Sequence, residues 1–166
     1  MKKIVFFLIL ISFVYSLQTG SIIFRKENNL LSDLFSQIDP CGYSHVGMII
    51  IKNKKPFVIH IEYDKKKDLR IIPLKKFLKN ASSYKILNPC IKINNSVLKT
   101  EVNLLLKKNI KFDTDIKLNN QKLYCTELVD FLFYQASGKH LYSYLYNFKN
   151  RKIITVRSIL KSKYLN

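Results

Sequence analysis

Residues 123–138 read LYCTELVDFLFYQASG, a pattern that predicts a largely buried helix. Apolar residues cover most of its sides. The polar residues recur at helical spacing on one face and are Glu127, Asp130 and Tyr134. Gly138 is placed to cap the C-terminus of the helix. Cys125 therefore falls in the first turn of a core helix.

Cys125 stands where a cysteine nucleophile would be placed. The positive end of the helix dipole and the unpaired backbone N–H groups favour thiolate over thiol, so we expect a lowered pKa for Cys125. The same N–H groups, including that of Cys125, can hold an oxyanion. The alternative is a core cysteine, because a lone Cys beside an apolar helix is usually buried.

A candidate base lies in residues 42–51, which read GYSHVGMIII. Pro40 and Gly42 mark a turn, and the apolar run after His45 predicts a buried strand. His45 therefore lies where a loop enters a strand, a common place for a catalytic group on a rigid element.

A second strand run, FVIHIE, ends at Glu62 and follows the first after a short polar segment, which predicts a hairpin. His60 and Glu62 are two residues apart and share a face of their strand. A loop centred between Asn53 and Lys54 would pair His45 with Glu62 and put His60 on the same face. A shift of the strand register by one residue would turn the side chains of His60 and Glu62 to the other face of the sheet, away from His45.

These stretches resemble a known family at five places. Residues 20–24 (GSIIF) are similar to its opening G-D-I-I-F strand, and 43–47 match its Y-S-H-V-G motif. Residues 58–61 (VIHI) stand where the family has V-I-E-A, while 112–113 followed by 124–129 match Y-D and Y-C-S-E-L-V. The family is the YiiX/YaeF-like group of circularly permuted papain-like hydrolases, in the NlpC superfamily. Poxvirus proteins and the lecithin retinol acyltransferase group are related to it.

The resemblance spans residues 20 to about 155 and implies a catalytic triad. In it, Cys125 is the nucleophile and His45 the base. His60 stands at the third catalytic position, where the family has Glu. In the acyltransferase relatives a second His does that job, so we assign the role to His60 and keep Glu62 in reserve.

The fold implied is α+β, a permuted papain-like (NlpC-type) domain whose antiparallel sheet or half-barrel packs on the helix carrying Cys125. The activity implied is that of a cysteine hydrolase, an amidase, peptidase or lipid-acyl hydrolase with a thioester acyl-enzyme. The implied substrate contains an amide or ester bond and is a peptide, a peptidoglycan stem or a lipid. Tyr124 and Tyr43 are candidates to line the cleft or, alternatively, packing residues. A catalytically inactive binding protein, favoured by His60, and an acyltransferase are the alternatives.

The other segments carry weaker patterns. Strands are predicted over 17–25, 69–73, 83–87 and 153–156, helices over 28–38, 74–78, 95–109 and 158–160, and a surface loop over 142–152. The chain shows no Gly-rich phosphate loop and no Cys/His cluster at metal-ligand spacing, so we expect neither a cofactor nor a metal.

The N-terminus has the proportions of a secretory signal. A short basic start precedes an apolar run over residues 4–14, and Ser16 is small enough for cleavage. We therefore expect a signal peptide over 1–16, one domain over 17–166, and export to the periplasm, the cell envelope or the medium. An uncleaved N-terminal anchor is the alternative.

The formal charge is +18, and +16 after removal of Lys2 and Lys3. A basic protein fits an anionic membrane surface or envelope polymer. The lysines are spread along the chain among abundant Asn and Ile, as AT-rich coding produces, so the charge is a weak clue. No recognition motif supports nucleic acid, and we expect none as a partner.

Three cysteines leave two arrangements open in an exported protein. Cys41 and Cys90 both lie in predicted loops and could pair, which would leave Cys125 as the reactive thiol. The alternative is three free thiols. His140 follows the predicted helix and is expected at the surface.

Overall fold

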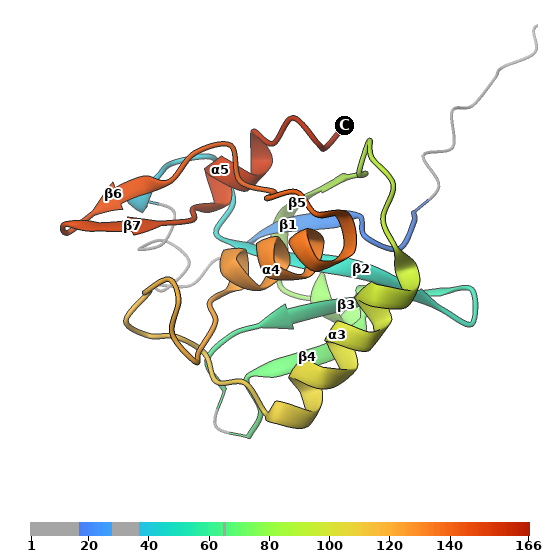
Figure 1. Ribbon diagram of the computed structural model, residues 1–166. Helices are drawn as coiled ribbons and strands as arrows, with labels where there is room; N and C mark the ends of the chain where they lie inside the picture. Colours follow the sequence, from blue (N-terminus) through green and yellow to red (C-terminus); the bar gives the residue numbers. More distant parts are fainter. Residues whose placement is uncertain (1–16, 28–36, 65) are drawn as a thin grey trace, which may run out of the picture.

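A five-stranded antiparallel sheet dominates the computed structural model, which describes residues 17–27, 37–64 and 66–166 (Figure 1). The strand order is β4-β3-β2-β1-β5. The strands are β1 (Ile22–Glu27), β2 (His45–Lys52), β3 (Lys55–Ile61), β4 (Leu69–Pro73) and β5 (Ala81–Leu87). This arrangement confirms the predicted α+β fold with an antiparallel sheet.

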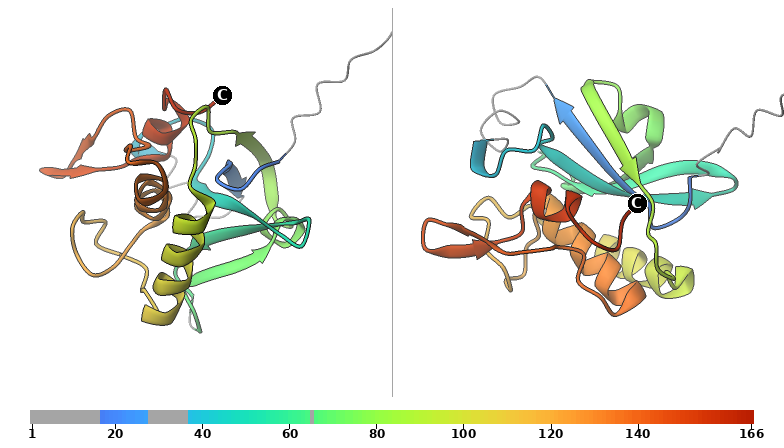
Figure 2. Two further views of the ribbon diagram at one scale, coloured as in Figure 1. Left: turned by 45° about the vertical axis from the view of Figure 1, so that its right-hand side comes forward. Right: turned by 90° about the horizontal axis from the view of Figure 1, so that it is seen from above.

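Two long helices cover one face of the sheet, as the view from above shows (Figure 2). They are α3 (Asn95–Lys108) and α4 (Cys125–Ser137). The short helix α2 (Leu74–Phe77) lies on the opposite face, where Phe77 closes a smaller core. The chain ends with a two-stranded ribbon, β6 (Tyr146–Phe148) and β7 (Arg151–Ile153), followed by α5 (Val156–Leu160).

Helix α4 forms where the sequence predicts it. Its inner face is fully buried at Leu128, Leu132 and Phe133 and packs on β2 and β3. Gly138 caps it with φ of 70°, a left-handed conformation that costs glycine little. The structure thus holds Cys125 at the N-terminus of a rigid core helix.

The predicted β2–β3 hairpin forms, and of the registers left open by the sequence it has the one with a centred loop. Lys52 pairs with Lys55 and Met48 with Ile59, so the loop is centred between Asn53 and Lys54. Both loop residues have positive φ, 51° and 60°, as a tight two-residue hairpin turn requires. Continued by three residues, this register sets position 45 opposite position 62.

Gly47 allows β2 and β3 to pack closely. An added Cβ would lie 2.5 Å from Cγ1 of Val58 and 3.0 Å from the carbonyl oxygen of Ile59. A side chain at this position would therefore push the two strands apart next to His45. The glycine of the HVG segment is explained by this contact.

Some sequence predictions differ from the structure. The segment expected as a surface loop contains the β6–β7 hairpin, whose turn at Lys149 and Asn150 has positive φ at both residues. The expected strand over 153–156 is wrong, because Thr155 forms a capping box that starts α5 at Val156. The first strand begins at Ile22 instead of residue 17. The helix predicted over 28–38 lies almost wholly outside the described residues.

Within the described part of the chain, no helix is long and apolar enough to cross a membrane.

Candidate functional site

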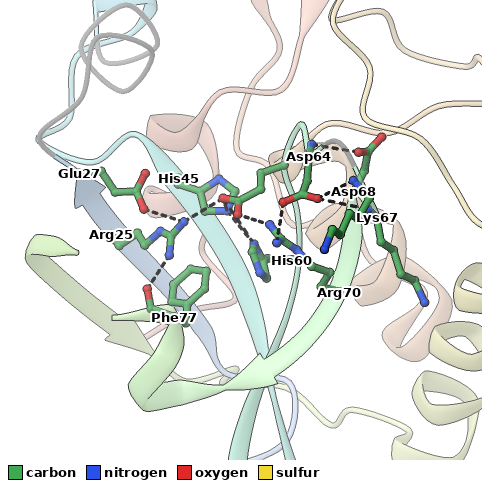
Figure 3. A network of polar contacts seen from close by, with 11 residues as sticks. Arg25, Glu27, His45, His60, Asp64, Lys67, Asp68, Arg70 and Phe77 are labelled. Carbon is green, nitrogen blue, oxygen red and sulfur yellow. Dashed lines mark hydrogen bonds and ion pairs between the residues drawn. The ribbon is translucent and has the colours of Figure 1, made fainter. Parts of the chain in front are cut away.

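The hairpin brings two histidines together at the start of β2 and the end of β3. Nε2 of His45 lies 3.2 Å from Nδ1 of His60, within hydrogen-bond distance (Figure 3). The rings meet edge to face, with centroids 5.4 Å apart. Because Nε2 of His45 is engaged by His60, Nδ1 is the nitrogen left for a thiol.

Glu62 is close to both rings but is held mainly by arginines. Its Oε2 lies 3.9 Å from Nε2 of His45 and 3.9 Å from Nδ1 of His60. The same oxygen accepts a hydrogen bond from Nη2 of Arg25 at 3.0 Å, while Arg70 binds Oε1. The carboxylate is therefore shared between two guanidinium groups (Figure 3).

The strand register alone is a poor guide to which residue orients His45. A pairing of 45 with 62 would favour Glu62 as the partner, yet His60 is nearer by 0.7 Å, the difference between 3.9 and 3.2 Å. Diagonal neighbours on one face of a sheet are within reach of aromatic side chains. The structure therefore places His60, and not Glu62, at hydrogen-bond distance from Nε2 of His45.

Phe77 forms an apolar wall behind the histidines. Its ring lies 5.8 Å from that of His45 and 5.1 Å from that of His60, between centroids. The Arg25 guanidinium lies over the same ring at 4.1 Å and donates to the Phe77 carbonyl. Both imidazoles are thereby removed from water, His60 completely.

The surroundings keep both imidazoles neutral. Burial lowers the pKa of His60 to about 3, with help from the positive charges of Arg25 and Arg70. Burial also lowers the pKa of His45 well below 6.5, and His60, Arg25 and Arg70 act in the same direction. A neutral His45 is a base that can accept a proton.

Cys125 lies beside the strand that carries His45. The backbone N–H groups of Val46, Thr126 and Cys125 itself lie against the thiol and lower its pKa. Burial acts more strongly and raises the pKa to about 11. The expected lowered pKa is therefore wrong, because the helix N-terminus does not offset the loss of water around the sulfur.

A cavity of about 440 Å³ opens onto the thiol and the base. Its lining includes Cys125, His45 and Glu62. Tyr43 and Tyr124 also line it, as predicted, and the rest of the wall is largely apolar. Tyr124 packs in the core as well, and its hydroxyl accepts a hydrogen bond from the backbone N–H of Ile154. The cavity wall also includes Ile38, Phe112, Ile116, Ile153, Ile154 and Val156.

The other cysteines and histidine stand apart from this site. Cys41, Cys90 and Cys125 are all free thiols, which favours the alternative of no disulfide. His140 is half exposed, as expected at the surface, and its Nδ1 lies 2.9 Å from Oδ2 of the buried Asp130.

Sequence reasoning missed the residues that surround the histidines. Arg25 is 5% exposed and lies opposite His45 in the pairing of β1 with β2. An arginine within an apolar strand run was the sequence signal that could have identified it. Asp113 of the FD segment is fully buried. It accepts hydrogen bonds from the N–H groups of Asp115 and Lys117 and from the Asn120 amide, so it fixes the loop that precedes Cys125.

The neutral His60 predicts a loss of stability in acid. The folded protein leaves His60 unprotonated until the pH nears 3, whereas an unfolded chain protonates histidine below about 6.5. The contribution of the neutral His60 to the free energy of unfolding is complete above pH 6.5 and falls by about 1.4 kcal/mol per pH unit below it. Urea unfolding at pH 7 and pH 5 should therefore show a loss about 2 kcal/mol larger in the wild type than in His60→Gln.

Glu127 has the opposite effect on stability in acid. Burial raises its pKa to about 7, so the folded protein gains a proton as the pH falls and is stabilised relative to the unfolded chain. Glu127 is present in both proteins and cancels in the comparison. Equal pH dependence of the two proteins would contradict a neutral buried His60.

Comparisons with known proteins identify the family of this chain. The sequence model of the family described as permuted papain-like amidase enzyme, YaeF/YiiX, C92 family, matches residues 16–165. The YiiX protein of Escherichia coli K12 is 26% identical over 133 residues, which cover 76% of this chain and 62% of the relative. A crystal structure described as metalloprotein YiiX from Escherichia coli O157:H7 superposes with a TM-score of 0.74 at 18% identity, covering 90% of this chain and 94% of that one. The chain therefore belongs to the YaeF/YiiX family of permuted papain-like amidases.

Proposed function

We propose that the protein is a cysteine hydrolase that cleaves an amide or ester bond through a thioester acyl-enzyme. Cys125 attacks the acyl carbon, His45 takes the thiol proton and passes it to the departing amine or alcohol, and His60 orients His45. Water then hydrolyses the thioester, with His45 as base, and frees the Cys125 thiol. The backbone N–H of Cys125 donates to the oxyanion. The observation that carries the proposal is the contact between Nε2 of His45 and Nδ1 of His60 beside the Cys125 cavity.

The tautomers needed for this reaction are consistent with the contact. His45 accepts the thiol proton at Nδ1 only if its Nε2 carries hydrogen, and that N–H donates to the lone pair on Nδ1 of His60. His60 is then protonated at Nε2. The raised pKa of Cys125 means that proton transfer to His45 accompanies attack, because the resting thiol is not ionised.

The cavity supports a substrate with an apolar acyl part. Most of its lining surface is apolar, with Ile116, Ile154 and Phe112 among the contributors, although polar side chains such as Asp39 and Thr155 also line it. Such a lining binds a hydrocarbon chain or an apolar peptide side chain better than a sugar. Lipid amides and peptides with an apolar residue before the cleaved bond are therefore the substrate classes we propose.

Cys125→Ala provides the test. The purified protein is incubated with envelope peptides and with lipid extracts, and the products are identified by mass spectrometry. We expect cleavage by the wild type, and none above background by Cys125→Ala, because the thioester cannot form. Equal product from both proteins would refute the thiol mechanism. Absence of cleavage together with slow thiol labelling that does not depend on His45 would favour the inactive binding protein.

We further propose that residues 1–16 direct export and are removed. The basic start, the apolar run and Ser16 support this assignment. We expect protein recovered from the envelope fraction to begin near Leu17 on N-terminal sequencing. Recovery with Met1 intact would contradict removal and favour an uncleaved anchor.

A further inference from the structure

Three metal-binding atoms converge at the start of β2 and the end of β3. Nε2 of His45, Nδ1 of His60 and Oε2 of Glu62 all lie within 4.8 Å of one another. The nitrogen atoms are 3.2 Å apart, and each is 3.9 Å from the carboxylate oxygen. Two imidazoles and one glutamate are a donor set that binds zinc in proteins.

The separations are close to those of a coordinated ion. Tetrahedral zinc with bonds of about 2.0–2.1 Å places its ligand atoms about 3.3 Å apart. The two nitrogens already have this spacing, and Glu62 would need to move by roughly 0.6 Å. The facing lone pairs of His45 and His60 can share one proton or one metal ion, but not both.

We propose that His45, His60 and Glu62 bind a single zinc-like divalent cation, and that the bound ion blocks the chemistry of Cys125. The second part rests on the proposed function. A neutral imidazole that gives its Nε2 lone pair to a metal keeps its hydrogen on Nδ1. His45 then has no free lone pair for the thiol proton, so metal binding converts the base into an inactive tautomer.

The surroundings allow an ion to enter and set limits on its affinity. His45 and Glu62 line the cavity, which gives a path for the ion and for a water as its fourth ligand. Arg25 and Arg70 can keep their hydrogen bonds to Glu62, as outer partners of metal-bound carboxylates do. Their positive charges oppose the cation, so we expect reversible binding that a chelator removes.

Binding is tested in a thiol-free protein, Cys41→Ser/Cys90→Ser/Cys125→Ala, so that no cysteine contributes and catalysis plays no part. Zn²⁺ is titrated by calorimetry, and one site is expected. His60→Gln and Glu62→Gln should each weaken it by at least ~10-fold, the lower end of the effect of losing even an outer-shell partner. His140→Gln is the matched control and should leave it unchanged.

Imidazole nitrogen NMR gives an independent readout, with zinc-induced shifts expected at Nε2 of His45 and Nδ1 of His60. Melting curves show whether each variant is folded. Absence of a 1:1 site, unchanged binding in both His60→Gln and Glu62→Gln, or loss of the site in His140→Gln would overturn the proposal.

Inhibition is tested with the wild-type thiol. Zn²⁺ should slow alkylation of Cys125, chelator should restore it, and His60→Gln should need at least ~10-fold more zinc for the same fractional effect. Equal zinc sensitivity in His60→Gln would mean that the ion binds the thiol, and faster alkylation with zinc would mean an activating metal. Either result overturns the inhibitory role. If zinc binds as expected but Cys125 is unreactive in metal-free protein, the proposed hydrolase fails while the metal site stands.

Discussion

His45→Ala is expected to slow alkylation of Cys125 near neutral pH by at least ~10²-fold, with a similar or larger loss of turnover. Burial raises the thiol pKa to about 11, so at pH 7.5 roughly 0.03% of it would be ionised without help. Fast reaction therefore requires transfer of the proton to a neighbouring base. We propose His45 as that base, because its ring is neutral and lines the cavity that contains the thiol.

The pH dependence of the alkylation rate separates reaction assisted by His45 from reaction of the thiolate that ionises without help. In the wild type His45 stays neutral well below pH 6.5, so the rate should hold between pH 7 and 5.5, where an ordinary histidine would lose about tenfold. In His45→Ala the rate should instead rise about tenfold per pH unit between 7 and 9, because it follows the thiolate fraction. His140→Ala is the control and should behave as the wild type. Equal rates for His45→Ala and the wild type would rule out the pair.

The sequence was most informative where a short pattern of residues is compatible with only one local structure. Gly138 after an apolar helical run predicted both α4 and its cap, and the polar segment at Asn53 predicted the hairpin, whose register follows if the loop is centred between Asn53 and Lys54. The register in turn placed His60 and Glu62 on the face of His45. These features depend on neighbours in sequence, so a single chain contains the information.

The remaining features depend on residues that meet only after folding. The pKa of Cys125 could not be judged from its helix position, because the burial that raises it comes from packing between α4 and the sheet. The role of Arg25 was hidden in the same way, since its partners Glu62 and Phe77 lie on other elements. The three ligand atoms of the proposed metal site come from two strands, so they likewise leave no spacing motif in the sequence.

A large loss of turnover is also expected when His60, the third residue of the proposed triad, is replaced. His60→Ala should lower turnover by at least ~10²-fold, the usual scale for a misplaced acid–base group, whereas Glu62→Gln should cost much less. His60 is the direct partner of His45 at 3.2 Å, and its loss frees the imidazole to rotate and to adopt the wrong tautomer. Glu62 is 3.9 Å away and its charge is matched by Arg25 and Arg70.

Rescue by an amide side chain distinguishes positioning of His45 from simple loss of structure. His60 has a buried Nε2 with no hydrogen-bond partner among the described residues, so it can orient His45 but hardly stabilise its cation. His60→Asn should recover part of the turnover, because an amide oxygen can accept the Nε2 hydrogen of His45, while His60→Ala should not. Both variants should keep the wild-type melting behaviour at pH 7 to within a few degrees if the role is positional. If Glu62→Gln abolishes turnover while His60→Ala is nearly silent, the carboxylate holds the role, because only its charge would then be stabilising the imidazolium formed when His45 takes the thiol proton.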